Sequence, residues 1–211
     1  MKQFFYHDPK LLIYGFLIVF FASYGQTFFI SLFNTEIRTF YNLSDGEFGL
    51  VYAISTLLSS FILISFAKLI DYIDLRFYSF IVSTGLLLAC IGMVILLNNI
   101  IFLFFVIFML RFFGQGAMTH AGETTMARYF GKDRGKALSV ATLGGMTGVM
   151  FLPYVSINLF KNLEMGQLWI YAALSLIFFI PFIFIALSDQ KIRHSKLPIW
   201  LLSKDNLTYG M

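Results

Sequence analysis

The sequence predicts an all-α membrane protein with six transmembrane helices. Apolar residues make up 59% of the chain and charged residues only 12%, whereas soluble domains carry about 25% charged residues. The apolar residues form six long runs, and a helix needs about 20 mostly apolar residues to cross a bilayer. Strands of a transmembrane barrel would be about ten residues long and alternating in polarity, so helices are favoured.

The six runs follow one another with short connections, which predicts one helical bundle over residues 1–187. The first run has no small-residue cleavage site, so it indicates a spanning helix rather than a removed signal peptide. Residues 188–211 are expected to form a cytoplasmic tail or an interdomain linker. The expected spans are residues 11–33, 48–70, 77–97, 100–127, 137–160 and 168–187.

Basic residues are distributed unevenly between the two sides of the predicted bundle. One side has only Arg38 and Lys161, and Arg111 belongs to neither side. Because cytoplasmic loops carry an excess of Lys and Arg, we expect an integral protein of a bacterial inner membrane with both termini in the cytoplasm. The twelve basic residues of the other side are Lys2, Lys10, Lys68, Arg76, Arg128, Lys132, Arg134, Lys136, Lys191, Arg193, Lys196 and Lys204.

The composition also limits the possible partners and cofactors. The formal net charge of +4 is explained by these basic loops and predicts no nucleic-acid partner. The single cysteine, Cys90, lies in an apolar run and is expected to pack there, and no Cys/His cluster indicates a metal. No phosphate-binding loop of the G-x-x-x-x-G-K-[ST] type occurs, so no cofactor is expected.

Arg111 is the anomalous residue of the fourth run, within LRFFGQGAMTHAGE (Leu110–Glu123). A charge at the bilayer centre costs about 2.5–3.5 kcal/mol on insertion scales, and Arg111 lies about 16 Å along the helix from its expected start. It is interpreted either as a cation that binds an anionic substrate group, or as the structural partner of a polar group on another helix. Gln115, one turn further on, shares its face. His120 should point to the opposite side, at about 100° per residue.

Three further runs carry signatures with the spacing of a known family. The first is AKLIDYIDLR (Ala67–Arg76), in which Asp71 and Arg76 take the acidic and final basic positions of a G-x-L-x-D-(R/K)-x-G-(R/x)-(R/K) motif, although Ala67 and Asp74 replace its glycines. The others are ARYFGKDRGKAL and GGMTGVMFLP. With the arginine and glycines that begin at Arg111, they resemble the major facilitator superfamily, in particular its monocarboxylate and oxalate/formate-like branches.

The resemblance implies half of a twelve-helix bundle, namely the N-terminal six helices. Such a protein would move a small solute by alternating access, driven by a gradient and coupled to an ion such as the proton, and an anionic solute would suit Arg111. It would contact membrane lipid and a second six-helix half. The implied substrate-binding residues are Arg111, Gln115, Tyr24 and Gln26, and the implied gating residues are Asp71, Arg76 and Glu123.

Two alternatives remain at this stage. The chain could be the product of a truncated or split gene, with no transport activity of its own, because transporter sites form between two halves. An intramembrane enzyme that uses His120 and Glu123 is the third hypothesis, although no third metal ligand lies near them. No enzymatic activity is expected.

Overall fold

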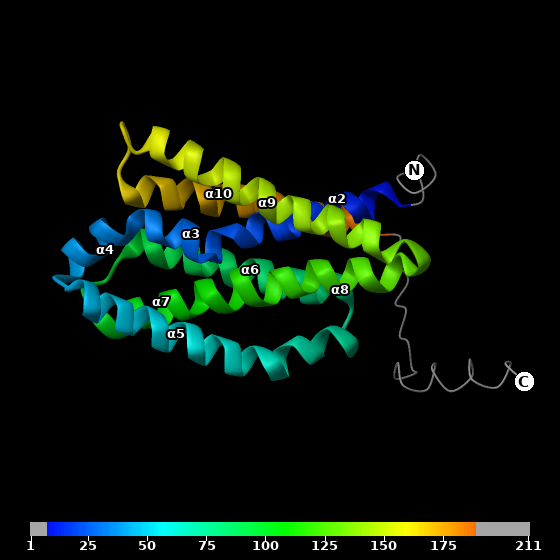
Figure 1. Cartoon of the computed structure of the whole chain (residues 1–211), viewed down its shortest axis with the longest axis horizontal. Coiled ribbons are helices and arrows are strands. Elements are labelled where there is room, and N and C mark those ends of the chain that lie inside the picture. Colours follow the sequence, from blue (N-terminus) through cyan, green and yellow to red (C-terminus); the bar gives the residue numbers. More distant parts are fainter. Residues whose placement is uncertain (1–7, 189–211) are drawn as a thin grey trace, which may run out of the picture.

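The protein is a bundle of long helices that run nearly parallel to one another (Figure 1). The computed structural model describes residues 8–188, and every element in that range is helical. Five helices are long and apolar enough to cross a membrane, or six if one bent pair counts as a single span. The all-α membrane architecture predicted from composition is therefore confirmed.

The first span is broken rather than continuous. Asp8 caps its start, where the Leu11 N–H donates to the Asp8 carboxylate at 3.0 Å. The span bends by 45° between its two parts, Pro9–Gly25 and Thr27–Tyr41, where the expected span 11–33 was a single helix. Its elements are α2 (Pro9–Ala22), η1 (Ser23–Gly25), α3 (Thr27–Ile30), η2 (Ser31–Phe33) and α4 (Asn34–Tyr41).

The second and third spans begin at side-chain caps. Ser44 and Glu47 form a capping box at the start of α5, which satisfies backbone donors that have no partner within the helix. Asp74 accepts the Arg76 N–H at 2.7 Å at the start of α6. The elements are α5 (Asp45–Phe66), η3 (Ala67–Asp71) and α6 (Leu75–Ile95).

The fourth span contains a segment of π-helix in its middle. Three elements form one continuous run over Ile100–Tyr129, and the later helices α9 and α10 continue through Pro153 and Pro181. The elements are α7 (Ile100–Met109), the π-helix η4 (Leu110–Met118), α8 (Thr119–Tyr129), η5 (Gly131–Asp133), α9 (Arg134–Leu159) and α10 (Met165–Ala186).

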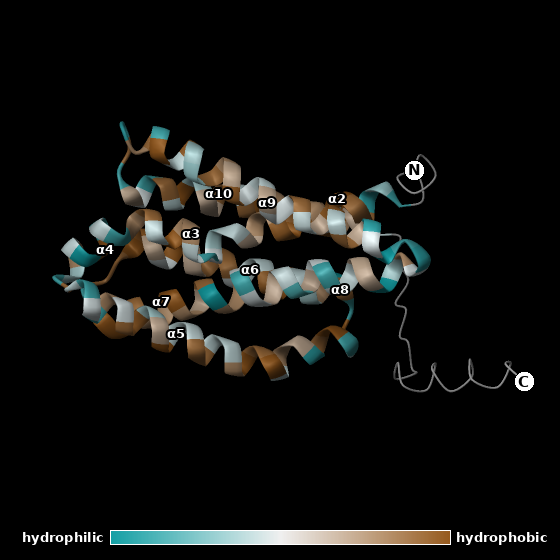
Figure 2. Cartoon of the chain, in the orientation of Figure 1, coloured by the Kyte–Doolittle hydropathy of each residue, from teal (hydrophilic) through white to brown (hydrophobic). Residues whose placement is uncertain are grey.

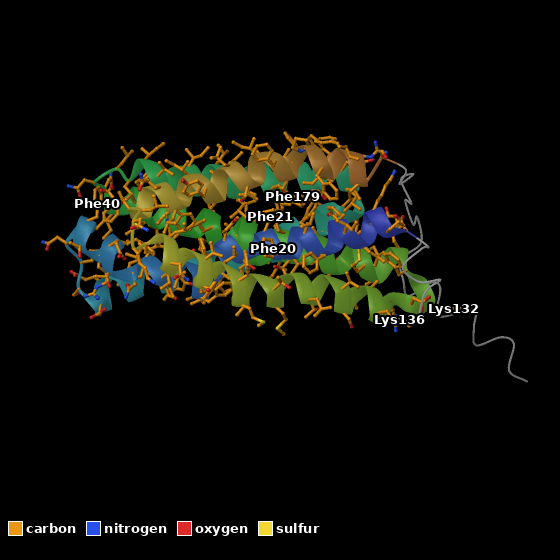
Figure 3. The ribbon with its side chains drawn as sticks, turned by 90° about the horizontal axis from the view of Figure 1, so that it is seen from above. Phe20, Phe21, Phe40, Lys132, Lys136 and Phe179 are labelled. Carbon is orange, nitrogen blue, oxygen red and sulfur yellow. The ribbon has the colours of Figure 1, made fainter. Side chains whose placement is uncertain are left out.

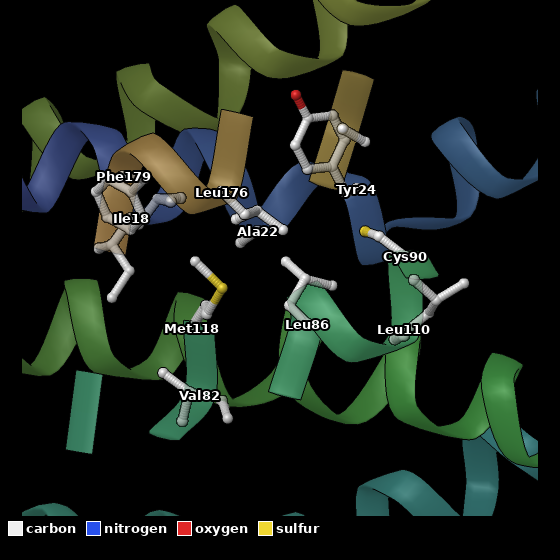
Figure 4. Packing of buried hydrophobic residues seen from close by; sticks show 14 of the residues in the cluster. Ile18, Ala22, Tyr24, Val82, Leu86, Cys90, Leu110, Met118, Leu176 and Phe179 are labelled. Carbon is white, nitrogen blue, oxygen red and sulfur yellow. The ribbon is translucent and has the colours of Figure 1, made fainter. Parts of the chain in front are cut away.

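The α2 helix lies in the centre of the bundle and α5 at its edge. α2 packs against α8, α9 and α10, α6 packs against α10, and α5 packs against α7 and η4. Figure 4 shows Ile18 and Ala22 of α2 facing Leu86 of α6, Met118 of η4 and Leu176 of α10. In the most apolar 18-residue stretch of each span, only 11% of the residues are buried in the span that contains α5, against 56% in α6. α5 therefore presents most of its surface outward.

Glycines allow the central helix to approach its neighbours closely. A Cβ on Gly144 of α9 would lie 2.1 Å from the carbonyl oxygen of Phe16, and one on Gly148 would lie 2.1 Å from the Ser23 hydroxyl. Small residues bring helix backbones together in membranes in this way. They hold α9 against α2 and η1.

The two ends of the bundle differ in charge. Lys132 and Lys136 lie at the end where α8 meets α9, and Phe40 lies at the opposite end (Figure 3). Hydrophilic residues gather at the ends of the helices, whereas apolar residues dominate their length (Figure 2). We call the end that contains η3 and η5 the basic end.

Candidate functional site

Arg111 lies in η4, where the fourth span is a π-helix. Its side chain is buried, with only 6% of the residue exposed. The i→i+5 hydrogen bonds of a π-helix are rare and are frequent at functional sites. The local geometry therefore marks the same residue that the sequence singled out for its charge.

The guanidinium of Arg111 is held by neutral oxygens from two other spans. Nε donates to Thr56 Oγ1 of α5 at 3.2 Å, and Nη1 donates to the Gly25 carbonyl at 3.2 Å and to Thr27 Oγ1 at 3.1 Å. The Tyr52 ring lies 5.2 Å from Cζ, within the range of a cation–π contact. None of the ion pairs among residues 8–188 involves Arg111, so its charge is hydrogen-bonded but not neutralised.

The break in the first span supplies one of these acceptors. Gln26 is extended, with ψ of 152°, and the Phe29 N–H donates to Gln26 rather than to Gly25. The Gly25 carbonyl is thus one of the groups that a helix end leaves without a partner in its own helix. Arg111 satisfies it from the fourth span.

A glycine pair brings the first and fourth spans close enough for this contact. A Cβ on Gly25 would lie 2.1 Å from the Leu110 carbonyl oxygen and 2.7 Å from the Gly114 Cα. The two backbones therefore touch with no side chain between them. Arg111 reaches Gly25 and Thr27 because of this approach.

Tyr52 and Thr27 extend the site, and sequence reasoning missed Tyr52. The Tyr52 hydroxyl donates to Thr27 Oγ1 at 2.8 Å. Tyr52 and Thr56 are one helical turn apart on α5, so they share a face. That spacing was the available signal, although nothing in the sequence indicated that this face meets Arg111.

The other predicted substrate residues are placed differently from one another. Gln115 is half-buried in η4, and its Oε1 atom is buried without a hydrogen-bond partner. Gln26 is half-buried at the break. Tyr24 is buried and shares a hydrogen bond of 2.9 Å with Ser175 of α10, so its hydroxyl is engaged away from Arg111.

The predicted gating residues lie at the basic end, but the structure does not bring all three together. Asp71 of η3 forms an ion pair with Arg128 of α8. Arg76 lies 3.9 Å from Asp74 and donates to the Ser188 carbonyl at 3.2 Å. Glu123 is exposed and makes no hydrogen bond or ion pair with the described residues. Asp71 thus joins the second and fourth spans through Arg128.

His120 lies in α8, beyond the π-helix. Its Nε2 atom is 3.2 Å from Thr124 Oγ1, and its Nδ1 atom is buried without a partner. The expected angle between His120 and Arg111 rested on about 100° per residue, and the i→i+5 segment between them removes that premise. Within residues 8–188, no group of three or more His, Cys, Asp or Glu residues could hold a metal ion.

These features define a class of protein: a polytopic helical membrane protein with a buried, unneutralised cation between its spans. A family model described as the Major Facilitator Superfamily matches residues 15–200. The chain belongs to this family, which confirms the resemblance to the superfamily that its motifs indicated. Members of the family are membrane transporters of small solutes rather than enzymes. No curated protein and no solved structure matches the chain significantly.

Proposed function

We propose that the chain forms the N-terminal half of a transporter and that Arg111 binds an anionic group of the solute. The observation that carries this proposal is a guanidinium that is 6% exposed and bonded only to neutral oxygens. A charge in the membrane normally pairs with another charge or with carbonyls, and it marks a solute or ion pathway. The neutral partners fix the orientation of Arg111 and leave its charge for an anion.

Gln115 and Gln26 complete the proposed substrate site. Gln115 lies four residues beyond Arg111 on η4, and its Oε1 atom has no partner. Because the oxygen and nitrogen of a glutamine amide are assigned from their surroundings, this amide can face a solute as a donor or as an acceptor. Tyr24 belongs to the proposed site only in a conformation that releases its hydroxyl from Ser175.

The basic end is proposed to face the cytoplasm and to carry the gate. Cytoplasmic segments of membrane proteins are enriched in Lys and Arg. The Asp71–Arg128 ion pair links η3 to α8, and alternating access requires such cytoplasmic contacts to break and reform. Arg76 and Glu123 lie near this pair in sequence and are proposed to exchange partners with it. A proton is the proposed coupling ion.

The second half of the transporter is proposed to cover the face between α5 and α9. The spans that contain these two helices are the least buried of the five straight candidate spans. Only 11% and 28% of the residues in their most apolar 18-residue stretches are buried. Transporter sites of this kind form at the interface of two repeats. The alternative proposal is a half-transporter with no transport activity on its own.

Uptake into proteoliposomes tests both proposals. One set contains the full chain alone, and the other also contains the product of an adjoining reading frame, if one encodes six more helices. Radiolabelled formate, acetate, oxalate and lactate are the solutes. We expect uptake of at least one of them when both halves are present, and no uptake by the Arg111→Ala variant.

Two controls make the result interpretable. The Lys161→Ala variant removes an exposed basic residue that belongs neither to the proposed site nor to the basic end, and it should retain most of the uptake. Protease accessibility of the basic end checks that Arg111→Ala inserts normally. Normal uptake by the Arg111→Ala variant would remove Arg111 from the substrate site. Uptake by the chain alone would exclude the alternative proposal of a half-transporter with no activity of its own.

A further inference from the structure

The hydrogen bonds around Arg111 leave specific donors unused. A guanidinium has five N–H donors. Nε uses its one donor on Thr56, and Nη1 uses its two on Gly25 and Thr27. The Tyr52 hydroxyl is a further hydrogen-bond partner of the guanidinium. Because Tyr52 takes at most one of the two Nη2 donors, Nη2 offers at least one N–H donor.

The Thr27 hydroxyl can only donate a further hydrogen bond, because its oxygen already accepts two. A hydroxyl oxygen has two lone pairs and one proton. Thr27 Oγ1 accepts from Arg111 Nη1 at 3.1 Å and from the Tyr52 hydroxyl at 2.8 Å. Its own proton has no acceptor among residues 8–188, and the residue is exposed. The Thr27 hydroxyl is therefore free to donate outward.

The two unused donor groups lie side by side. Thr27 Oγ1 is hydrogen-bonded to Nη1, and Nη1 and Nη2 share the Cζ carbon, so one small group can reach both. Carboxylate oxygens accept such hydrogen bonds, and a carboxylate offers two oxygens in one plane. A neutral amide offers only one oxygen acceptor, and its NH₂ group would face donors.

We infer that Arg111 Nη2 and the Thr27 hydroxyl together donate hydrogen bonds to one carboxylate group. Tyr52 is the positioning residue in this arrangement, because its hydrogen bond to Thr27 leaves the Thr27 hydroxyl able only to donate. This inference rests on the proposed function and adds the substrate class and two specificity-determining residues. Without the Tyr52 hydroxyl, one lone pair of Thr27 is released, and Thr27 can rotate to accept a hydrogen bond. The site then loses part of its preference for a carboxylate over a donor-bearing group.

Ligand-induced thermal stabilisation of the purified full chain tests the inference. The probes are acetate, benzoate and succinate, each compared with its neutral analogue acetamide, benzamide or succinamide. We expect at least one carboxylate, and none of the amides, to raise the melting temperature of the wild-type protein.

Variants of Thr27 and Tyr52 then separate binding from folding. Thr27→Val should weaken carboxylate binding about ten- to hundredfold, the range expected for a hydrogen bond to a charged group. Thr27→Ser retains the hydroxyl and should bind within a few-fold of wild type. Tyr52→Phe should weaken binding about two- to tenfold and reduce the carboxylate-to-amide preference, which a purely structural role of Tyr52 would leave unchanged.

The outcomes distinguish this inference from the proposed function. If no carboxylate stabilises the wild-type protein, or if Arg111→Ala still binds one, the anion-binding function itself fails. If Arg111→Ala loses carboxylate binding but Thr27→Val keeps it, the proposed function stands and the hydrogen bond from Thr27 to the carboxylate is overturned. If Tyr52→Phe lowers affinity without changing the carboxylate-to-amide preference, Tyr52 is not the positioning residue.

Discussion

Two arginines of one helical run, Arg111 and Arg128, are in opposite situations. Arg128 lies near the end of α8, is 42% exposed, and pairs with an Asp71 carboxylate that is 48% exposed. Arg111 lies in η4, is 6% exposed, and has only neutral partners. The solvated pair is already balanced and contributes little to stability. The buried arginine carries a charge that no residue among 8–188 neutralises, and this is the charge that we propose for binding a ligand.

The largest expected effect comes from giving Arg111 an internal carboxylate, which would make it resemble Arg128. In Thr56→Asp, the new carboxylate replaces the hydroxyl that Nε contacts at 3.2 Å. Carboxylate binding should fall at least about a hundredfold, because paired charges in a low dielectric attract strongly. The melting temperature should stay the same or rise. Binding is measured by thermal stabilisation with the carboxylates named above.

Thr56→Asn is the matched control for this change. It has the same size and adds no charge, so it should retain most of the carboxylate binding. If Thr56→Asp binds carboxylates as well as Thr56→Asn does, the charge of Arg111 is not what the ligand uses.

The second effect tests the close approach that places Arg111. In Gly25→Ala the added Cβ would lie 2.1 Å from a backbone carbonyl oxygen, so the first and fourth spans must separate. We expect a loss of about 1–3 kcal/mol in the free energy of unfolding, as for overpacked interiors. Circular dichroism in detergent measures the melting temperature. Gly49→Ala, at a glycine with nothing within 4 Å, should cause no loss, and equal losses in both variants would contradict the argument.

A smaller effect is expected at Tyr24, because its hydroxyl faces α10 rather than Arg111. Tyr24→Phe removes the 2.9 Å hydrogen bond to Ser175 and should cost about 0.5–1.5 kcal/mol of stability. Carboxylate binding should not change. Tyr154→Phe, at a residue that is 69% exposed, serves as the control. A loss of binding in Tyr24→Phe would return Tyr24 to the substrate site in the described conformation.

The smallest effect on stability is expected at the solvated pair. Asp71→Asn should change the free energy of unfolding by less than about 1 kcal/mol, as measured by chemical denaturation in detergent. The reversed pair, Asp71→Arg with Arg128→Asp, should behave like wild type. If Asp71→Asn alone lowers the free energy of unfolding by several kcal/mol, the exposed Arg128 pair contributes much more to stability than its solvent exposure indicates.

Sequence reasoning found the residue at the centre of the site but not which groups its guanidinium contacts. Arg111 was recognisable because a charge in an apolar run is costly wherever the helix packs. Its partners Tyr52, Thr56 and Gly25 come from two other spans, and their meeting depends on tertiary packing that no local pattern encodes. The π-helix and the break at Gln26 were missed for the same reason, since neither is marked by a proline.

The basic end illustrates a second limit. The motif of the second connection identified Asp71 and Arg76 as charged positions, and this connection lies within the residues that the family model matches. A motif specifies residue types and spacing, whereas the choice among nearby partners of opposite charge depends on a few ångströms of backbone placement. Asp71 pairs with Arg128 for that reason, and Glu123 remains exposed.

The bond from Arg111 to the Gly25 carbonyl makes the arginine a mechanical joint. It fastens the fourth span to the first span at the point where the first span bends by 45°. Any displacement of the guanidinium therefore pulls on the bend itself. Arg111 contacts both the bend and the candidate ligand position. A ligand that displaces the guanidinium would therefore act directly on the bend, with no intermediate residue.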